Sequence, residues 1–166
     1  MSNPKIQTLL NQTMNIELRA QYYYLQASAW AANHNFSGCH DFLLKHADEE
    51  HLHAMKIFRY IIDLGEDATF SDIPQPIIKA SSIEELFSHV YQHEIDVTKA
   101  YDQAIETVLA EKDNQTFAFL QWFVNEQAEE LTQCRRILDT IKIIGSGPHS
   151  LYMIDQEVAK IAGEST

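Results

Sequence analysis

Glu50 and His53 are the residues of this sequence best suited to metal chemistry. They lie three positions apart, so a helix would present a carboxylate and an imidazole on one face. Other carboxylate or amide side chains interrupt apolar patterns elsewhere in the chain: Glu17, Glu94, Gln127 and Glu130. One imidazole among hard oxygen ligands suits iron, manganese or zinc.

These polar interruptions fall at matched positions. Each lies near the middle of an apolar or aromatic seam with a seven-residue repeat, which helices packed at small angles bury. Glu50 follows Glu17 by 33 residues, and Gln127 follows Glu94 by the same number. In antiparallel hairpins with short turns, such residues reach similar heights. We therefore expect one interior layer that holds these side chains, with His53 one turn from Glu50.

Buried carboxylates in this number must be neutralised. An unpaired charge in a dry interior is costly, and none of the 12 lysines and arginines lies on the seams near the layer. Protonation would neutralise some carboxylates, but the whole group favours a multivalent cation. Six ligands can hold two ions that share one carboxylate. For any single residue a simpler interpretation stays open, namely a solvent-facing glutamate or an ordinary core histidine.

The elements that must position these residues are helices. Glycine and proline together occupy only nine of 166 positions, and the long uninterrupted stretches between them favour an all-α chain. Asn3 before Pro4 and the capping-box pattern from Ser82 to Glu85 are typical of helix N-termini. We expect a single domain over 1–166, with helices at about 4–36, 38–64, 82–111, 114–144 and 149–161.

The lengths of the connections predict the topology. Ser37 and the breaker Gly38 separate helix one from helix two. This join and the one near residue 113 are short, so helices one and two form one antiparallel hairpin, and three and four form another. The 17 residues at 65–81 can span roughly 56 Å, whereas a bundle helix is roughly 40 Å long. We therefore expect an antiparallel four-helix bundle with one long crossover between helices two and three, plus a short fifth helix.

A sparse internal repeat is consistent with two related hairpins. A shift of 77 residues places Glu17 on Glu94 and Tyr24 on Tyr101. The repeat is weak evidence alone, but it relates residues of the expected polar layer.

Composition excludes several classes of function. The chain carries 12 basic and 24 acidic residues, a net charge of −12, which disfavours nucleic-acid binding and invites cations. Hydrophobic residues make up 45%, too many for a disordered chain. No apolar run is long enough for a membrane span, and no signal-peptide pattern is seen. Cys39 and Cys134 form neither a disulfide framework nor a paired metal motif. We expect a cytoplasmic protein.

The chain resembles the bacterial non-haem ferritins within the ferritin-like diiron family. The resemblance extends over nearly the whole sequence and is carried by residues 14–18, 46–53, 93–94, 119–127 and 151–155. It implies an iron-storage ferroxidase that oxidises Fe(II) to Fe(III) with O2 or H2O2. It also implies a diiron site within each subunit, a homo-oligomeric cage of 24 subunits and a ferric oxyhydroxide mineral stored inside the cage.

The resemblance further implies roles for individual residues. Glu17, Glu50 and His53 correspond to ligands of a first iron, and Glu50 bridges to a second. Glu94 and Glu130 correspond to ligands of that second iron.

Further residues match positions around these two irons. Gln127 corresponds to an outer contact of the second iron, and Tyr24 to a tyrosine beside the diiron site. Glu49, Glu126 and Glu129 match a third iron site at the inner surface, which shares Glu130.

Two departures separate the chain from the bacterioferritins. Those proteins carry two Glu-x-x-His pairs, whereas here the second pair is Gln127-x-x-Glu130. The residue that follows Glu50 is His51, where bacterioferritins place the methionine that ligates haem, so we do not expect haem. A diiron oxygenase or peroxidase-type bundle, a haem-binding bacterioferritin and a purely structural bundle are the alternatives.

Overall fold

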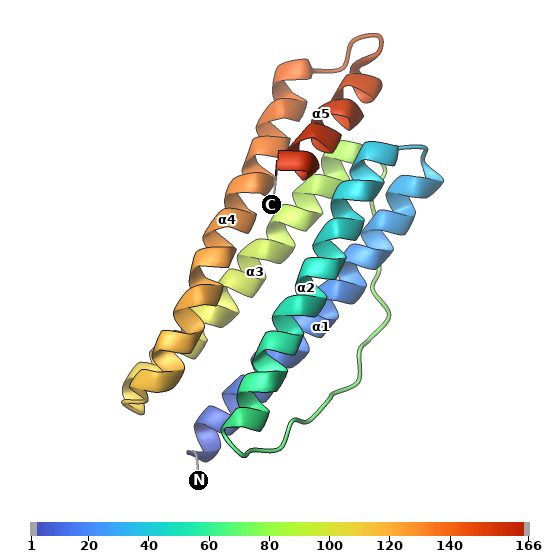
Figure 1. The fold of residues 1–166 in the computed structure, drawn as a ribbon. Coiled ribbons are helices and arrows are strands. Elements are labelled where there is room, and N and C mark those ends of the chain that lie inside the picture. The colour runs from blue at the N-terminus through green and yellow to red at the C-terminus, as the bar shows by residue number, and fades with distance from the viewer. Residues whose placement is uncertain (1–2, 165–166) are drawn as a thin grey trace.

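The computed structural model describes residues 3–164, and within them it contains five helices and no strand (Figure 1). The helices are α1 Pro4–Asn33, α2 Ser37–Asp63, α3 Ile83–Ala110, α4 Asn114–Ile144 and α5 Ser150–Glu164. The expected all-α fold is confirmed. None of the helices in this described part has the length and apolar character that a membrane span requires.

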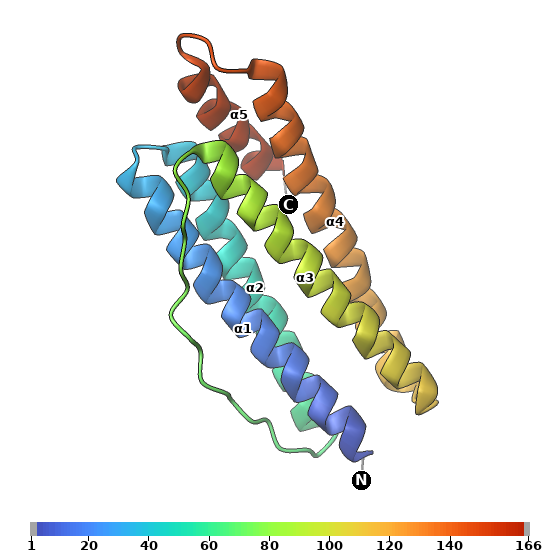
Figure 2. The same cartoon turned by 180° about the vertical axis from the view of Figure 1, so that it is seen from behind.

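The four long helices form two antiparallel hairpins, α1 with α2 and α3 with α4 (Figure 1). The connection from α2 to α3 runs along the outside of the first hairpin for the length of the bundle (Figures 1 and 2). Asn15 anchors it, because its side chain donates to the Thr69 carbonyl at 2.8 Å and accepts from the Ser71 amide at 2.9 Å. The long crossover is therefore as expected. The short α5 packs against α2 and α4 at one end of the bundle.

Short polar side chains cap the N-termini of three helices, and at the start of α1 Asn3 Oδ1 accepts from the Lys5 amide at 3.0 Å. Ser82 Oγ accepts from the Glu85 amide at 3.1 Å at the start of α3. Asp113 Oδ1 accepts from the Thr116 amide at 3.0 Å at the start of α4. These bonds satisfy amides that have no partner inside the helix.

The turn between α1 and α2 differs from the expectation. α1 ends at Asn33, three residues early, because Asn35 adopts the left-handed backbone conformation with φ of 63°. Gly38 does not interrupt a helix, because it lies in the first turn of α2. A β-carbon there would clash with the backbone oxygen of Asp155 and lie 2.9 Å from the Ala159 side chain. Gly38 thus allows α5 to approach α2 closely.

The core consists of two apolar clusters along the bundle axis. Phe42 and Phe87 belong to the cluster near α5, and Leu10 and Ile57 belong to the cluster near the N-terminus. Between the clusters the seams are interrupted by polar residues such as Glu17, which is fully buried. This arrangement holds polar groups rigidly in the middle of an otherwise apolar bundle.

Candidate metal centre

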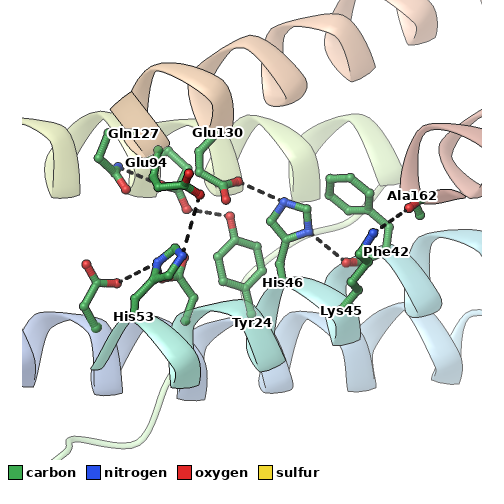
Figure 3. Close-up of polar contacts among 12 residues, drawn as sticks. Tyr24, Phe42, Lys45, His46, His53, Glu94, Gln127, Glu130 and Ala162 are labelled. Atoms are coloured by element: carbon green, nitrogen blue, oxygen red, sulfur yellow. Dashed lines mark hydrogen bonds and ion pairs between the residues drawn. The ribbon is translucent and has the colours of Figure 1, made fainter. Parts of the chain in front are cut away.

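Buried polar side chains from all four long helices meet between the two apolar clusters (Figure 3). Each is at most 5% exposed: Glu17, His46, Glu50, His53, Glu94, Gln127 and Glu130. The six residues expected in one interior layer are all among them. His46 is an additional member that the sequence analysis did not include.

Glu17, Glu50 and His53 form the first group of the layer. His53 Nδ1 lies 3.1 Å from Glu50 Oε2 and 3.6 Å from Glu17 Oε2. The three side chains offer ligand atoms that all lie within 4.8 Å of one another. α1 and α2 therefore bring together two carboxylates and one imidazole, a donor set that suits a divalent transition metal.

Glu94 occupies the opposite side of the layer, on α3. The Tyr24 hydroxyl donates to Glu94 Oε1 at 2.5 Å, and Gln127 Nε2 donates to Glu94 Oε2 at 3.1 Å (Figure 3). Gln127 Nε2 also donates to Thr98 Oγ1 at 3.3 Å. Both oxygens of Glu94 thus accept hydrogen bonds, from α1 and from α4.

Glu130 and His46 form a buried pair at the edge of the layer. His46 Nε2 lies 2.9 Å from Glu130 Oε2, and His46 Nδ1 lies 3.0 Å from the Phe42 carbonyl oxygen (Figure 3). A carbonyl can only accept, so Nδ1 carries a proton and Nε2 faces the carboxylate. His46, Glu49 and Glu130 also have ligand atoms within 4.8 Å of one another.

Glu126 and Glu129 lie on the outer side of the layer. Glu126 is half-buried, with Oε2 3.8 Å from His53 Nε2, whereas Glu129 is exposed. Together with Glu49 and Glu130 they line a cavity of about 390 Å³. The residues matched to a third iron site therefore line one cavity, which buried Glu130 shares with the layer.

Burial and mutual repulsion control the protonation of the layer. Burial, reinforced by the charge of Glu17, raises the pKa of Glu50 well above its ordinary value. Burial also raises the pKa of Glu94, to about 7, and the charge of Glu130 adds to this effect. Burial acts in the same direction on Glu17, but the closeness of His53 and Glu50 outweighs it and lowers the pKa of Glu17. The carboxylates cannot all ionise together without a compensating cation.

Histidines supply the positive partners in this layer. Glu17 and Glu50 pair with His53, and Glu130 pairs with His46. Imidazole and carboxylate groups both bind divalent metals once their protons are displaced. The arrangement can therefore exchange protons for metal ions.

His46 and Tyr101 are the residues of the layer that the sequence analysis missed. Tyr101 is 1% exposed, and its hydroxyl donates to Glu17 Oε1. Signals for both exist in the sequence. His46 lies seven residues before His53 on the same helix, and Tyr101 corresponds to Tyr24 in the internal repeat.

Comparison with known proteins connects this geometry to one family. Residues 7–144 match the Ferritin family, which is described as a ferritin-like domain. A bacterial non-heme ferritin of Escherichia coli O6:H1 is 35% identical over 161 residues, which cover 97% of this chain and 98% of the relative. The bacterial non-heme ferritin of Campylobacter jejuni is 36% identical over 162 residues, which cover 98% of this chain and 97% of the relative.

Solved structures show the same fold. A ferritin of the archaeon Archaeoglobus fulgidus, engineered into a closed form, is 30% identical and superposes with a TM-score of 0.92 over 96% of this chain and 97% of the other. A structure of the open-pore ferritin of the same archaeon is also 30% identical. It superposes with a TM-score of 0.91 over 95% of this chain and 96% of the other.

Proposed function

Because the chain belongs to the ferritin family, we propose that it is an iron-storage ferroxidase of the bacterial non-haem type. It oxidises Fe(II) to Fe(III) at a diiron centre inside each subunit and stores the product as a ferric oxyhydroxide mineral. The observation that carries this proposal is the layer of four buried carboxylates drawn from four helices, Glu17, Glu50, Glu94 and Glu130. Bound divalent iron supplies the positive charge that neutralises these carboxylates.

The two groups of the layer support two adjacent iron positions. Glu17, Glu50 and His53 hold the first iron, and their ligand atoms already converge. Glu50 bridges to the second iron, which Glu94 and Glu130 hold. Mixed oxygen and nitrogen ligation of this kind binds Fe(II) and then releases the oxidised ion, since iron here is a substrate rather than a resident cofactor.

Gln127 and Tyr24 act on the second position through Glu94. Both donate hydrogen bonds to its carboxylate, which limits the charge that Glu94 presents to a metal. Gln127 is therefore an outer contact of the second iron, and Tyr24 orients one of its ligands.

The electron balance follows from two iron ions. Two Fe(II) ions supply two electrons, which with two protons reduce O2 to H2O2. With H2O2 as the oxidant, the same two electrons and two protons yield two molecules of water. Hydrolysis of the Fe(III) product then forms the mineral and releases protons.

The acidic cavity beside the layer supports a third iron site. Glu49, Glu126, Glu129 and Glu130 line it, and His46 lies next to Glu49 and Glu130. An ion that leaves the diiron centre meets further carboxylates there on its way to the inner surface. The exposed position of Glu129 is consistent with such an exit.

Storage of a mineral requires a closed assembly. Identical subunits related by point-group symmetry form such a cage, so the chain forms a homo-oligomer. We assign a 24-subunit cage in the cytoplasm on the basis of the relatives' family. Their names do not favour a diiron oxygenase or a haem-binding bacterioferritin.

The test combines size with iron chemistry. Light scattering on the purified protein is expected to give the mass of 24 chains of 19.1 kDa each. Aerobic addition of Fe(II) far beyond the binding capacity of the subunit is expected to yield a soluble ferric core that co-elutes with the cage. A small oligomer that precipitates its iron, or anaerobic Fe(II) titration without saturable binding, contradicts the proposal.

A further inference from the structure

Tyr101 presents its hydroxyl to the carboxylate layer while its ring is held in the core. The side chain is 1% exposed, and the hydroxyl donates to Glu17 Oε1. The ring stacks on Phe123 with centroids 5.4 Å apart and planes 11° apart. The position of the hydroxyl is therefore determined by packing, and the hydrogen bond to Glu17 is built into the bundle.

Tyr101 and Tyr24 form a reciprocal arrangement. Tyr24 on α1 donates to Glu94 on α3, and Tyr101 on α3 donates to Glu17 on α1. Each tyrosine follows the carboxylate of its own helix by seven residues. The two hairpins thus exchange equivalent hydrogen bonds across the layer.

The carboxylates of Glu94 and Glu17 nevertheless differ in how many of their oxygens accept hydrogen bonds. Glu94 has both oxygens hydrogen bonded, by Tyr24 and by Gln127. Glu17 has only Oε1 occupied by Tyr101, and its buried Oε2 accepts no hydrogen bond and lies 3.6 Å from His53 Nδ1. A carboxylate can bind a metal through one oxygen or through both. Glu17 therefore offers one free oxygen, directed at the other ligands of the first position.

We propose that Tyr101 is a positioning residue that restricts Glu17 to binding a divalent cation through a single oxygen and so weakens the first metal position. This inference rests on the proposed function, in which iron must leave after oxidation. A carboxylate that also chelated through Oε1 would hold the ion more tightly and slow its release.

Substitution of Tyr101→Phe tests this without disturbing the core, because the ring that stacks on Phe123 is retained. The probe is Co(II), added anaerobically to the full-length protein and followed by calorimetry and visible absorption. Loss of the hydroxyl frees Glu17 Oε1, so one binding step should tighten several-fold, up to about tenfold. The Co(II) d–d bands should also weaken, because a second oxygen raises the coordination number.

Tyr60→Phe is the matched control. Its hydroxyl lies 3.1 Å from Thr116 Oγ1 and its ring stacks on Phe119, so the variant also loses one phenol hydrogen bond but none in the layer. It should bind Co(II) as the wild type does. Unchanged or weaker binding with an unchanged spectrum in Tyr101→Phe overturns the inference about Tyr101 alone. Absence of saturable Co(II) binding in the wild type overturns the proposed function as well.

Discussion

His46 Nε2 lies 2.9 Å from Glu130 Oε2, in a pair whose members are 1% and 5% exposed. Burial opposes the charged imidazole, but the hydrogen bond and charge of Glu130 raise the pKa of His46 to about 9. The His46 proton therefore compensates Glu130 at neutral pH when no metal is bound. A cation that binds at Glu130 can take over this role.

Replacement of His46 by glutamine should destabilise the metal-free protein. Glu130 then stays buried without a cationic partner, which should lower the free energy of unfolding by about 2 kcal/mol. Thermal unfolding after treatment with a chelator measures the loss, and saturating Zn(II) should reduce it because the metal supplies the missing charge. His51→Gln, on an exposed position of the same helix, is the control. Equal midpoints for both variants would contradict this account.

Substitution of Glu50→Ala should abolish fast Fe(II) oxidation and leave assembly intact. Glu50 supplies the shared ligand of the two proposed iron positions, so the initial rate should fall by at least about 100-fold, more than is usual for residues that only support a ligand. Stopped-flow absorbance measures the rate, and light scattering measures the assembly. The exposed Glu106→Ala variant on α3 should oxidise iron normally. Progress curves identical to those of the wild type would refute the bridging role of Glu50.

Substitution of Glu129→Gln should affect the third iron position alone. Glu129 is exposed on the acidic cavity and lies outside the buried layer. Anaerobic Fe(II) titration should fall from about three to about two ions per subunit, with the first phase of oxidation preserved. Asp102→Asn, exposed on α3, is a control for the loss of one surface charge. If the stoichiometry stays at its wild-type value, Glu129 is not a ligand.

Metal binding should release more protons at pH 6 than at pH 8. The pKa of Glu94 is raised to about 7 by burial and by Glu130, so the carboxyl is mostly protonated at pH 6 and mostly ionised at pH 8. A metal ion must displace that proton only at the lower pH. A pH-stat titration with Zn(II), normalised per bound ion, measures the release. In Glu94→Gln the pH-dependent part should shrink by up to about one proton per subunit, and an unchanged difference would exclude Glu94 as its source.

Gly38→Ala should loosen the contact between α2 and α5. The added methyl group clashes with the backbone of Asp155, whose carboxylate accepts from the Gly38 and Cys39 amides at 3.0 and 2.8 Å. Overpacking of this kind costs about 1–3 kcal/mol, measured as a lower thermal midpoint. Gly163→Ala is the matched control, because a β-carbon there meets nothing within 4 Å. Equal thermal midpoints for the two variants would show that α5 can shift to accommodate the methyl group without loss of stability.

The helices and the main members of the site could be predicted from local patterns. The heptad positions of Glu17, Glu50 and Glu94 depend only on the helical repeat, and the breakers that separate the helices act within a few residues. The end of α1 could not be predicted in this way. Gly38 looked like a helix breaker, but its role is to admit α5, which is more than 100 residues away in the chain.

Local patterns were enough to predict that four helices would each carry a polar residue in an apolar seam, because side-chain periodicity along a helix is a local property. The hydrogen bonds that those residues make became known only from the packed bundle. The pairing of Glu17 with Tyr101 and of Glu130 with His46 joins different helices. Such contacts depend on how far the helices slide and rotate against one another, and these movements are set by packing across the whole bundle rather than by any one segment.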